Sequence, residues 1–405
     1  MSNPLTFLCV SSFHKGEDFL TAARAEGIRV FLVTSEQLNG TWSSACYDEV
    51  FYIKDQTKDK GSWNMEHLIA GLAWLMQSNK IDRVVALDDF DVEKGAHIRE
   101  HFRIPGMGQT TARYFRDKLA MRIKAQDAGV SVPQFSPIFN DDEVNKYIAE
   151  VAPPWLIKPR SEASATGITK AHNGTELWDI IHGLGDRRHH YLVESFRPGD
   201  VYHVDSLNVD GKVAFVRVSQ YLATPMEVAH GGGVFRSMVC EYGSQDEKTL
   251  TKLNAEVMDA FGMQFSASHT EFIKDRETGK FVFLETSSRV GGANLAEMVE
   301  MSSGINIWVE WARIEAAMAR NTKYKCPKPK NQYAGILVSL ARTQWPDQSC
   351  FSDPEICWRM HREYHIGLIV ASADRNRLRE LLDNYAERVL ADFHATAPVS
   401  MRPAG

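Results

Sequence analysis

The sequence lacks the long apolar segments and paired cysteines that mark membrane and secreted proteins. It has no run of about 18 apolar residues, so no transmembrane helix is expected. Met1–Val10 lacks the basic segment and long apolar stretch of a signal peptide, and is expected to form a first β-strand. The six cysteines include no CxxC pair and no metal-ligand spacing, which favours reduced thiols in a cytoplasmic protein.

An excess of basic residues is also missing. The chain has 46 Lys and Arg against 52 Asp and Glu, for a formal net charge of −6. A mildly acidic chain does not attract nucleic acid or an anionic membrane, so we expect neither as a partner. A locally basic site for an anionic small molecule remains compatible with this charge.

The common nucleotide-binding fingerprints are absent as well. The residues after the strand Leu5–Val10 read SSFHKG, which is not the GxGxxG of a dinucleotide-binding domain. The small-residue loop Ser161–Gly167 does not match the P-loop pattern GxxxxGK[ST]. The βα region is therefore interpreted as a scaffold that orients a substrate.

The first third of the chain alternates strand-like and helix-like segments. Apolar runs at Leu5–Val10, Arg29–Thr34 and Arg83–Asp88 alternate with helical stretches at Glu17–Glu26 and Asn64–Asn79. This alternation predicts a Rossmann-like parallel sheet with helices on both faces, which is an α/β arrangement.

The rest of the chain reads as α+β. A helix is expected over Thr111–Ala128, and mostly short strands follow from Trp155 to Glu285. A basic linker, Lys323–Lys330, precedes a final segment. In that segment we expect two strands and a helix, at Tyr333–Leu340, Gly367–Ala371 and Arg375–Phe393.

One hairpin carries two glutamates. Glu271 lies in the strand-like His269–Ile273, Glu285 ends the next apolar strand, and Arg276–Gly279 forms a tight turn between them. An antiparallel pair would bring both carboxylates to one face at about the same depth, as a hard oxygen site suited to Mg²⁺. Exposed or ion-paired glutamates explain this hairpin equally well.

Three further features have the residue types that nucleotide binding requires. Lys158 ends an apolar strand before the loop Ser161–Gly167, whose amides and hydroxyls could contact phosphates, although a surface hairpin is the simpler explanation. Glu194 ends another strand, where backbone groups are open to a purine edge. Lys118 begins a helix. None of these features is specific alone.

In their order and spacing, these features resemble the ATP-grasp superfamily over roughly residues 105 to 320. The matching residues are Asp117-Lys118, Gly129, Val132-Pro133, Ile157-Lys158-Pro159, Val193-Glu194, Gly199-Asp200, Glu271 and Glu285-x-Ser287-x-Arg289-x-Gly291. The resemblance implies a βα domain at residues 1–112 and an ATP-grasp domain at 113–322, with two α+β subdomains that clamp ATP. The smaller of these, the lid, is expected at about 130–193, and a small C-terminal lobe at 323–405.

The resemblance also implies a role for each site residue. Contacts to ATP are expected from Lys118, Lys158, Ser164, Thr166 and Gly167 at the phosphates, from Val193, Glu194, Ser195, Phe196, Ile273 and Leu284 at the adenine, and from Asp200 at the ribose. Mg²⁺, or Mn²⁺ in its place, would be bound by Glu271, Glu285 and Ser287. Arg289 would hold the transferred phosphate or the substrate carboxylate.

Ser287 departs from the family pattern, which usually has asparagine at this position. A serine hydroxyl is a shorter and poorer metal ligand than an amide carbonyl. The second metal is therefore expected to be weaker, bridged by water, or ligated differently.

A glycine-rich segment, Ala229–Arg236, reads AHGGGVFR and could close over a substrate. His230 could donate to a carboxylate or act as a base, and Arg236 could clamp a carboxylate. A glycine-rich turn with an exposed histidine is the alternative.

The resemblance implies an ATP-dependent carboxylate–amine (or thiol) ligase that forms an acyl phosphate and releases ADP and phosphate. An amino acid or small carboxylic acid and an amine are the expected substrates, and a homodimer is the expected assembly. Three alternatives remain: a purine-biosynthesis-type or carboxylase-type enzyme, an ATP-grasp kinase, and a nucleotide-binding regulator. The missing biotin-carrier segment weakens the carboxylase alternative, and Ser287 makes the regulator conceivable.

Overall fold

The computed structural model describes residues 4–163, 166–224, 226–228 and 232–396. Its N-terminal part is a four-stranded parallel sheet of order β3-β2-β1-β4, as the alternating pattern predicted. The strands are β1 (Thr6–Ser11), β2 (Arg29–Ser35), β3 (Glu49–Ile53) and β4 (Arg83–Ala86).

Helices cover both faces of this sheet because its central strand is apolar on both sides. In β1, Phe7 and Cys9 pack in the cluster that contains α1 (Glu17–Ala25), while Leu8 and Val10 face the other way. That second face packs against α2 (Met65–Leu75) and α3 (Val92–Phe102). The α/β prediction for this part is confirmed.

The central part is an eight-stranded sheet in which every recorded strand pairing is antiparallel. Its order is β13-β12-β9-β10-β11-β14-β16-β15. In chain order the strands are β9 (Gly199–Val209), β10 (Lys212–Tyr221), β11 (Phe235–Val239), β12 (Ser266–Asp275), β13 (Phe281–Ser287), β14 (Tyr333–Leu340), β15 (Ile356–Arg359) and β16 (His365–Ser372).

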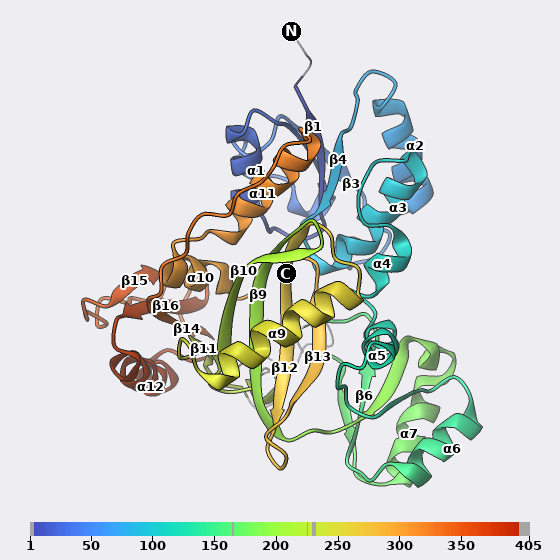
Figure 1. Cartoon of the computed structure of the whole chain (residues 1–405), viewed down its shortest axis with the longest axis vertical. Helices are drawn as coiled ribbons and strands as arrows, with labels where there is room; N and C mark the ends of the chain where they lie inside the picture. Colours follow the sequence, from blue (N-terminus) through green and yellow to red (C-terminus); the bar gives the residue numbers. More distant parts are fainter. Residues whose placement is uncertain (1–3, 164–165, 225, 229–231, 397–405) are drawn as a thin grey trace.

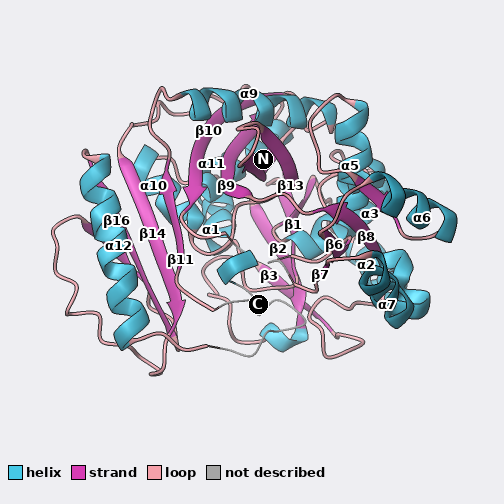
Figure 2. Cartoon of the chain, turned by 90° about the horizontal axis from the view of Figure 1, so that it is seen from below, coloured by secondary structure: helices cyan, strands magenta, loops and turns pink. Residues whose placement is uncertain are grey.

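Helices pack on both faces of the large sheet. The helix α9 (Gln245–Ala260) lies across one face, over β9 and β10 (Figure 2), and its buried side chains share a cluster with Phe272 of β12. On the other face, α11 (Ile307–Ala319) packs between this sheet and α1, and α10 (Leu295–Ser303) contacts β14. The last helix, α12 (Arg375–Asp392), packs on β14 and β16.

A smaller sheet of order β5-β8-β6-β7 forms a separate unit at the lower right of Figure 1, with α6 (Asp141–Glu150) and α7 (Gly174–Leu184). Its strands are β5 (Phe135–Pro137), β6 (Trp155–Pro159), β7 (Thr169–Ala171) and β8 (Tyr191–Ser195). The strands from the C-terminal segment lie on the opposite side of the central strands (Figure 1). They continue the large sheet through the β11–β14 pairing.

The single helix predicted over Thr111–Ala128 is wrong. The structure has two helices here, α4 (Gln109–Arg113) and α5 (Lys118–Asp127). Asp117 separates them: it has an extended backbone, and its side chain accepts the amides of Leu119 and Ala120 as an N-cap. A capped start is incompatible with a continuous helix because the cap residue is non-helical.

Predictions for the C-terminal segment agree with the structure. The strand expected at Tyr333–Leu340 is β14, the one expected at Gly367–Ala371 lies within β16, and the final helix differs from α12 by one residue. The short strands β11 and β15 were not anticipated. Among the described residues, no helix is both long and apolar enough to be a membrane span.

Candidate active site

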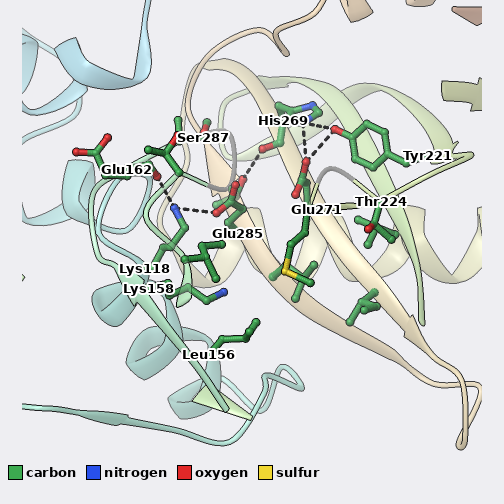
Figure 3. Close-up of a pocket in the computed structure, with 18 of the residues that line it drawn as sticks. Lys118, Leu156, Lys158, Glu162, Tyr221, Thr224, His269, Glu271, Glu285 and Ser287 are labelled. Carbon is green, nitrogen blue, oxygen red and sulfur yellow. Dashed lines mark hydrogen bonds and ion pairs between the residues drawn. The ribbon is translucent and has the colours of Figure 1, made fainter. Parts of the chain in front are cut away.

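A cavity of about 630 Å³ lies between the large sheet, the small sheet and the residues that follow β4. It brings together residues that are far apart in the sequence (Figure 3). Twelve predicted site residues line it: Lys118, Lys158, Thr166, Glu194, Ser195, Phe196, Glu271, Ile273, Leu284, Glu285, Ser287 and Arg289.

Six predicted residues do not appear among the lining residues. Ser164 and His230 lie outside the described residues. Val193 is buried in the core of the small sheet, and Asp200 is exposed at the start of β9. Gly167 follows the lining residue Thr166, and Arg236 forms an ion pair of 2.5 Å with Asp383 on α12.

The two hairpin glutamates are direct cross-strand partners. β12 and β13 pair antiparallel with Glu271 opposite Glu285, which confirms the predicted hairpin. Glu271 accepts a hydrogen bond of 2.8 Å from the Tyr221 hydroxyl, and Glu285 pairs with Lys118 at 2.8 Å (Figure 3). Ser287 follows two residues later, so it shares the cavity-facing side of β13 with Glu285.

These three side chains fit a divalent cation. Two carboxylates and a hydroxyl on paired strands form a hard oxygen donor set of the kind that Mg²⁺ prefers. Burial raises the pKa of Glu285, but the Lys118 ammonium lowers it more, so the net pKa lies below its ordinary value. Glu285 is thus held as a carboxylate, which is the form that binds metal.

Lys118 is fixed at the junction of the two sheets. Its amide donates to the carbonyl of Arg160 at 2.8 Å, and its ammonium donates to the carbonyl of Glu162 at 2.6 Å. Because Asp117 caps α5 and also pairs with Arg160, the start of the helix is tied to the strand end that carries Lys158. The cap places Lys118 in the cavity.

Lys158 and Glu194 belong to a buried ion cluster with Arg122. Glu194 is 2% exposed; one of its oxygens pairs with Lys158, and the other accepts from Arg122 at 2.9 and 3.1 Å. The amides of Ser195 and Phe196 donate to the carbonyls of Gln134 and Pro154, which immediately precede β5 and β6. The roles of these residues toward adenine stay predictions.

Arg289 reaches the cavity beside Asp89, which follows β4 in the N-terminal part. Its guanidinium donates to Asp89 Oδ2, and to the carbonyl of Val290 at 2.8 Å. Asp89 is not part of any motif recognised in the sequence. Its only local signal is its position after a parallel strand, where the carboxyl ends of strands commonly form sites.

A second feature missed from the sequence is a buried chain of polar groups next to Glu271. Asp205 accepts from His203 and from His269, each at 2.8 Å, and His269 Nε2 lies 3.6 Å from Glu271. Burial lowers the pKa of His269, but Asp205 and the hydrogen bonds raise it overall to about 9. His269, which itself lines the cavity, connects these polar groups to Glu271.

Comparisons with known proteins agree with this architecture. No protein-family model matches the chain. It is 24% identical over 243 residues to the L-arginine-specific L-amino acid ligase of Bacillus subtilis, covering 58% of this chain and 57% of that protein. The match therefore spans less than two thirds of that relative's length.

Two solved structures have the same fold over nearly the whole chain. An L-amino acid ligase from Bacillus licheniformis superposes with a TM-score of 0.74 at 15% identity, covering 98% of this chain and 100% of that one. The second is the biotin carboxylase domain dimer of Hydrogenobacter thermophilus 2-oxoglutarate carboxylase, with MgADP, ADP and bicarbonate. Its TM-score is 0.69 at 16% identity, covering 96% of this chain and 90% of that one.

The large sheet and the small sheet, each with its helices, face each other across the cavity. The chain has the fold of ATP-grasp ligases, and the curated relatives that it resembles in sequence are ligases as well. ATP-grasp ligases use ATP and Mg²⁺.

Proposed function

We propose that the protein is an ATP-dependent carboxylate–amine ligase acting through an acyl phosphate. The observation that carries the proposal is the convergence of Lys118, Lys158, Glu271, Glu285 and Arg289 on one cavity. Phosphoryl transfer depends on positioning and charge neutralisation, and this constellation provides both.

In the first step, a carboxylate oxygen of the substrate attacks the γ-phosphorus of ATP, and the bond to the bridging oxygen breaks to release ADP. Lys118 and Lys158 would hold the phosphates, and Arg289 would hold the substrate carboxylate or the transferred group. Mg²⁺ bound by Glu271, Glu285 and Ser287 would neutralise charge on the phosphates.

In the second step, a neutral amine attacks the acyl carbon, phosphate leaves with the bonding pair, and the nitrogen loses a proton. Arg289 would stabilise the developing oxyanion. An amino acid or small carboxylic acid is the proposed acyl substrate, supported by the relative named an L-amino acid ligase. The amine could also be replaced by a thiol.

Other parts of the assignment belong to this proposal. We propose Mn²⁺ as a possible replacement for Mg²⁺, the three-part division at residues 112/113 and 322/323, and a homodimer, which the dimeric neighbour supports. A cytoplasmic location is supported by the six cysteines, all of which are free.

The test is ADP release from Mg-ATP with pooled amino acids and small carboxylic acids. We expect release that depends on the pool and falls by a factor of about 100 or more in Glu285→Gln. Glu277→Gln, an exposed position on the same hairpin and outside the cavity, is the control and should match the wild type. ATP binding without ADP release from any pool would favour the regulator instead, and absent ATP binding would refute the proposal.

A further inference from the structure

The donor set predicted for the metal is short of one strong ligand. Ser287 stands where the superfamily pattern has asparagine, and a hydroxyl is a poorer ligand than an amide carbonyl. Glu271 and Glu285 provide two carboxylates on the same face of the hairpin. A second divalent cation beside Ser287 needs another oxygen ligand from elsewhere in the chain.

Asp89 is placed where that oxygen is needed. It comes from the N-terminal sheet, is 5% exposed, and lines the same cavity as Glu285 and Ser287. Asp89 forms an ion pair with Arg289 and lies beside Ser287.

One oxygen of this carboxylate has no partner. Asp89 Oδ2 accepts from Arg289, whereas Asp89 Oδ1 is buried without a hydrogen bond among the described residues. Buried carboxylate oxygens are normally hydrogen-bonded or bound to a metal. An unpaired oxygen in the same cavity as Glu285 and Ser287 is a free ligand position.

We propose that Asp89 Oδ1 is a metal ligand that replaces the missing asparagine amide, so that the second cation is held by Asp89, Glu285 and Ser287. The inference rests on the nucleotide-and-metal part of the proposed function. It makes the N-terminal sheet a direct contributor to the metal site, while Oδ2 remains free to hold Arg289.

The competing explanation is that Asp89 only positions Arg289. The two explanations differ in what happens to metal binding when Arg289 is removed. If Asp89 is a ligand, Arg289→Gln removes a competing cation, and Mn²⁺ binds at least as tightly as in the wild type. If Asp89 acts only through Arg289, Asp89→Asn and Arg289→Gln should change the affinity for Mn²⁺ to the same extent.

The experiment is a Mn²⁺ titration of the full chain saturated with a non-hydrolysable ATP analogue, with free Mn²⁺ measured by electron paramagnetic resonance. No carboxylate or amine is present. We expect Asp89→Asn to weaken binding by a factor of about 10 or more. Asp88→Asn is the matched control: Asp88 is the adjacent buried aspartate, paired with Lys15 at 2.5 Å and absent from the cavity lining.

A ligand swap sharpens the test. Asp89→Asn/Ser287→Asn supplies the amide that the superfamily pattern carries, and should bind Mn²⁺ more tightly than Asp89→Asn. Ser287→Asn alone should change binding little, because Asp89 already fills the position. This single variant keeps the test valid if Asp89→Asn does not fold.

Several results would overturn the inference. These are unchanged binding in Asp89→Asn, equal weakening in Arg289→Gln, no recovery in the double variant, and a gain of about tenfold in Ser287→Asn alone. Failure of wild type to bind Mn²⁺ would do the same. Mn²⁺ binding that follows the expected pattern in a protein that never releases ADP would refute only the proposed ligase activity.

Discussion

Glu194 lies between two cations, Arg122 and Lys158, and forms an ion pair with each. Removing one member of a buried ion cluster leaves uncompensated charge, which is more costly than the cluster itself is stabilising. We expect Glu194→Gln to lower the free energy of unfolding by about 3–5 kcal/mol. Urea denaturation measures this, and a loss below about 1 kcal/mol would contradict it.

The same carboxylate predicts a pH dependence. Burial raises the pKa of Glu194, but Arg122 and Lys158 lower it more, so the folded value lies below the ordinary 4.5. The contribution of the Glu194 carboxylate to the free energy of unfolding is therefore complete above pH 4.5, and it is lost as the pH falls through the pKa of the folded state. Wild type should lose more stability on acidification than Glu194→Gln; parallel curves would exclude this carboxylate as the cause.

At the residue scale, contacts within one hairpin could be predicted from the sequence, whereas contacts between residues far apart in the sequence could not. Glu271 and Glu285 were found because a tight turn fixes their strands as neighbours. Asp89 meets Arg289 across 200 positions of chain, and no local pattern encodes such a contact. The partners of Glu194 were missed for the same reason: Arg122 lies 72 residues away.

At the scale of elements, the start of α5 decides where Lys118 lies. Asp117 both caps this helix and pairs with Arg160, the residue that follows the strand carrying Lys158. Asp117→Ala should lower the free energy of unfolding by about 1–2 kcal/mol and weaken ATP binding, because Lys118 loses its fixed position. Thermal melting and equilibrium ATP binding measure these effects.

The matched variant is Asp117→Asn. Asparagine caps helices about as well as aspartate, so α5 should stay intact while the charge toward Arg160 is lost. A smaller loss of stability than in Asp117→Ala is expected. Equal losses would mean that the ion pair, and not the cap, holds the helix start.

Predictability at this scale followed the strength of local signals. The strand β14 and the helix α12 were found almost to the residue because their apolar spacing is regular. The break between α4 and α5 was missed because amphipathic spacing continues across Asp117, where capping, and not periodicity, determines the structure.

At the scale of the whole molecule, one core joins the N-terminal sheet to the large sheet. Trp311 on α11 is 2% exposed and meets Phe19 of α1 at 5.1 Å between ring centroids. The same cluster includes Leu207 of β9 and Ala267 of β12. The two sheets should therefore unfold together, although they are separate in sequence.

We expect wild type to show a single unfolding transition by far-ultraviolet circular dichroism and by tryptophan fluorescence, with coincident midpoints. Trp311→Ala should lower the free energy of unfolding by about 3–5 kcal/mol, because it opens a cavity in the shared core. Two separated transitions in wild type would show that the N-terminal sheet is an independent unit.

The parallel sheet could be predicted from the sequence, whereas the full extent of the large sheet could not. Alternating strands and helices point to parallel neighbours close in sequence. The pairing of Phe235 with Val338 joins segments that are separated in the sequence by three helices, two strands and a linker. The strand β11 is also too short to give a clear sequence pattern.

The β11–β14 pairing also means that one edge of the growing sheet stays unpaired during synthesis. β11 leaves the ribosome with β10 as its neighbour, but β14 follows only after roughly 100 more residues, on the order of 5–20 s at ordinary translation speed. Throughout this interval the nascent chain carries an unpaired strand edge, a template for association with other chains. That edge is covered only when β14, near the end of the chain, pairs with β11. Premature termination should therefore yield an aggregation-prone product and not a smaller functional protein.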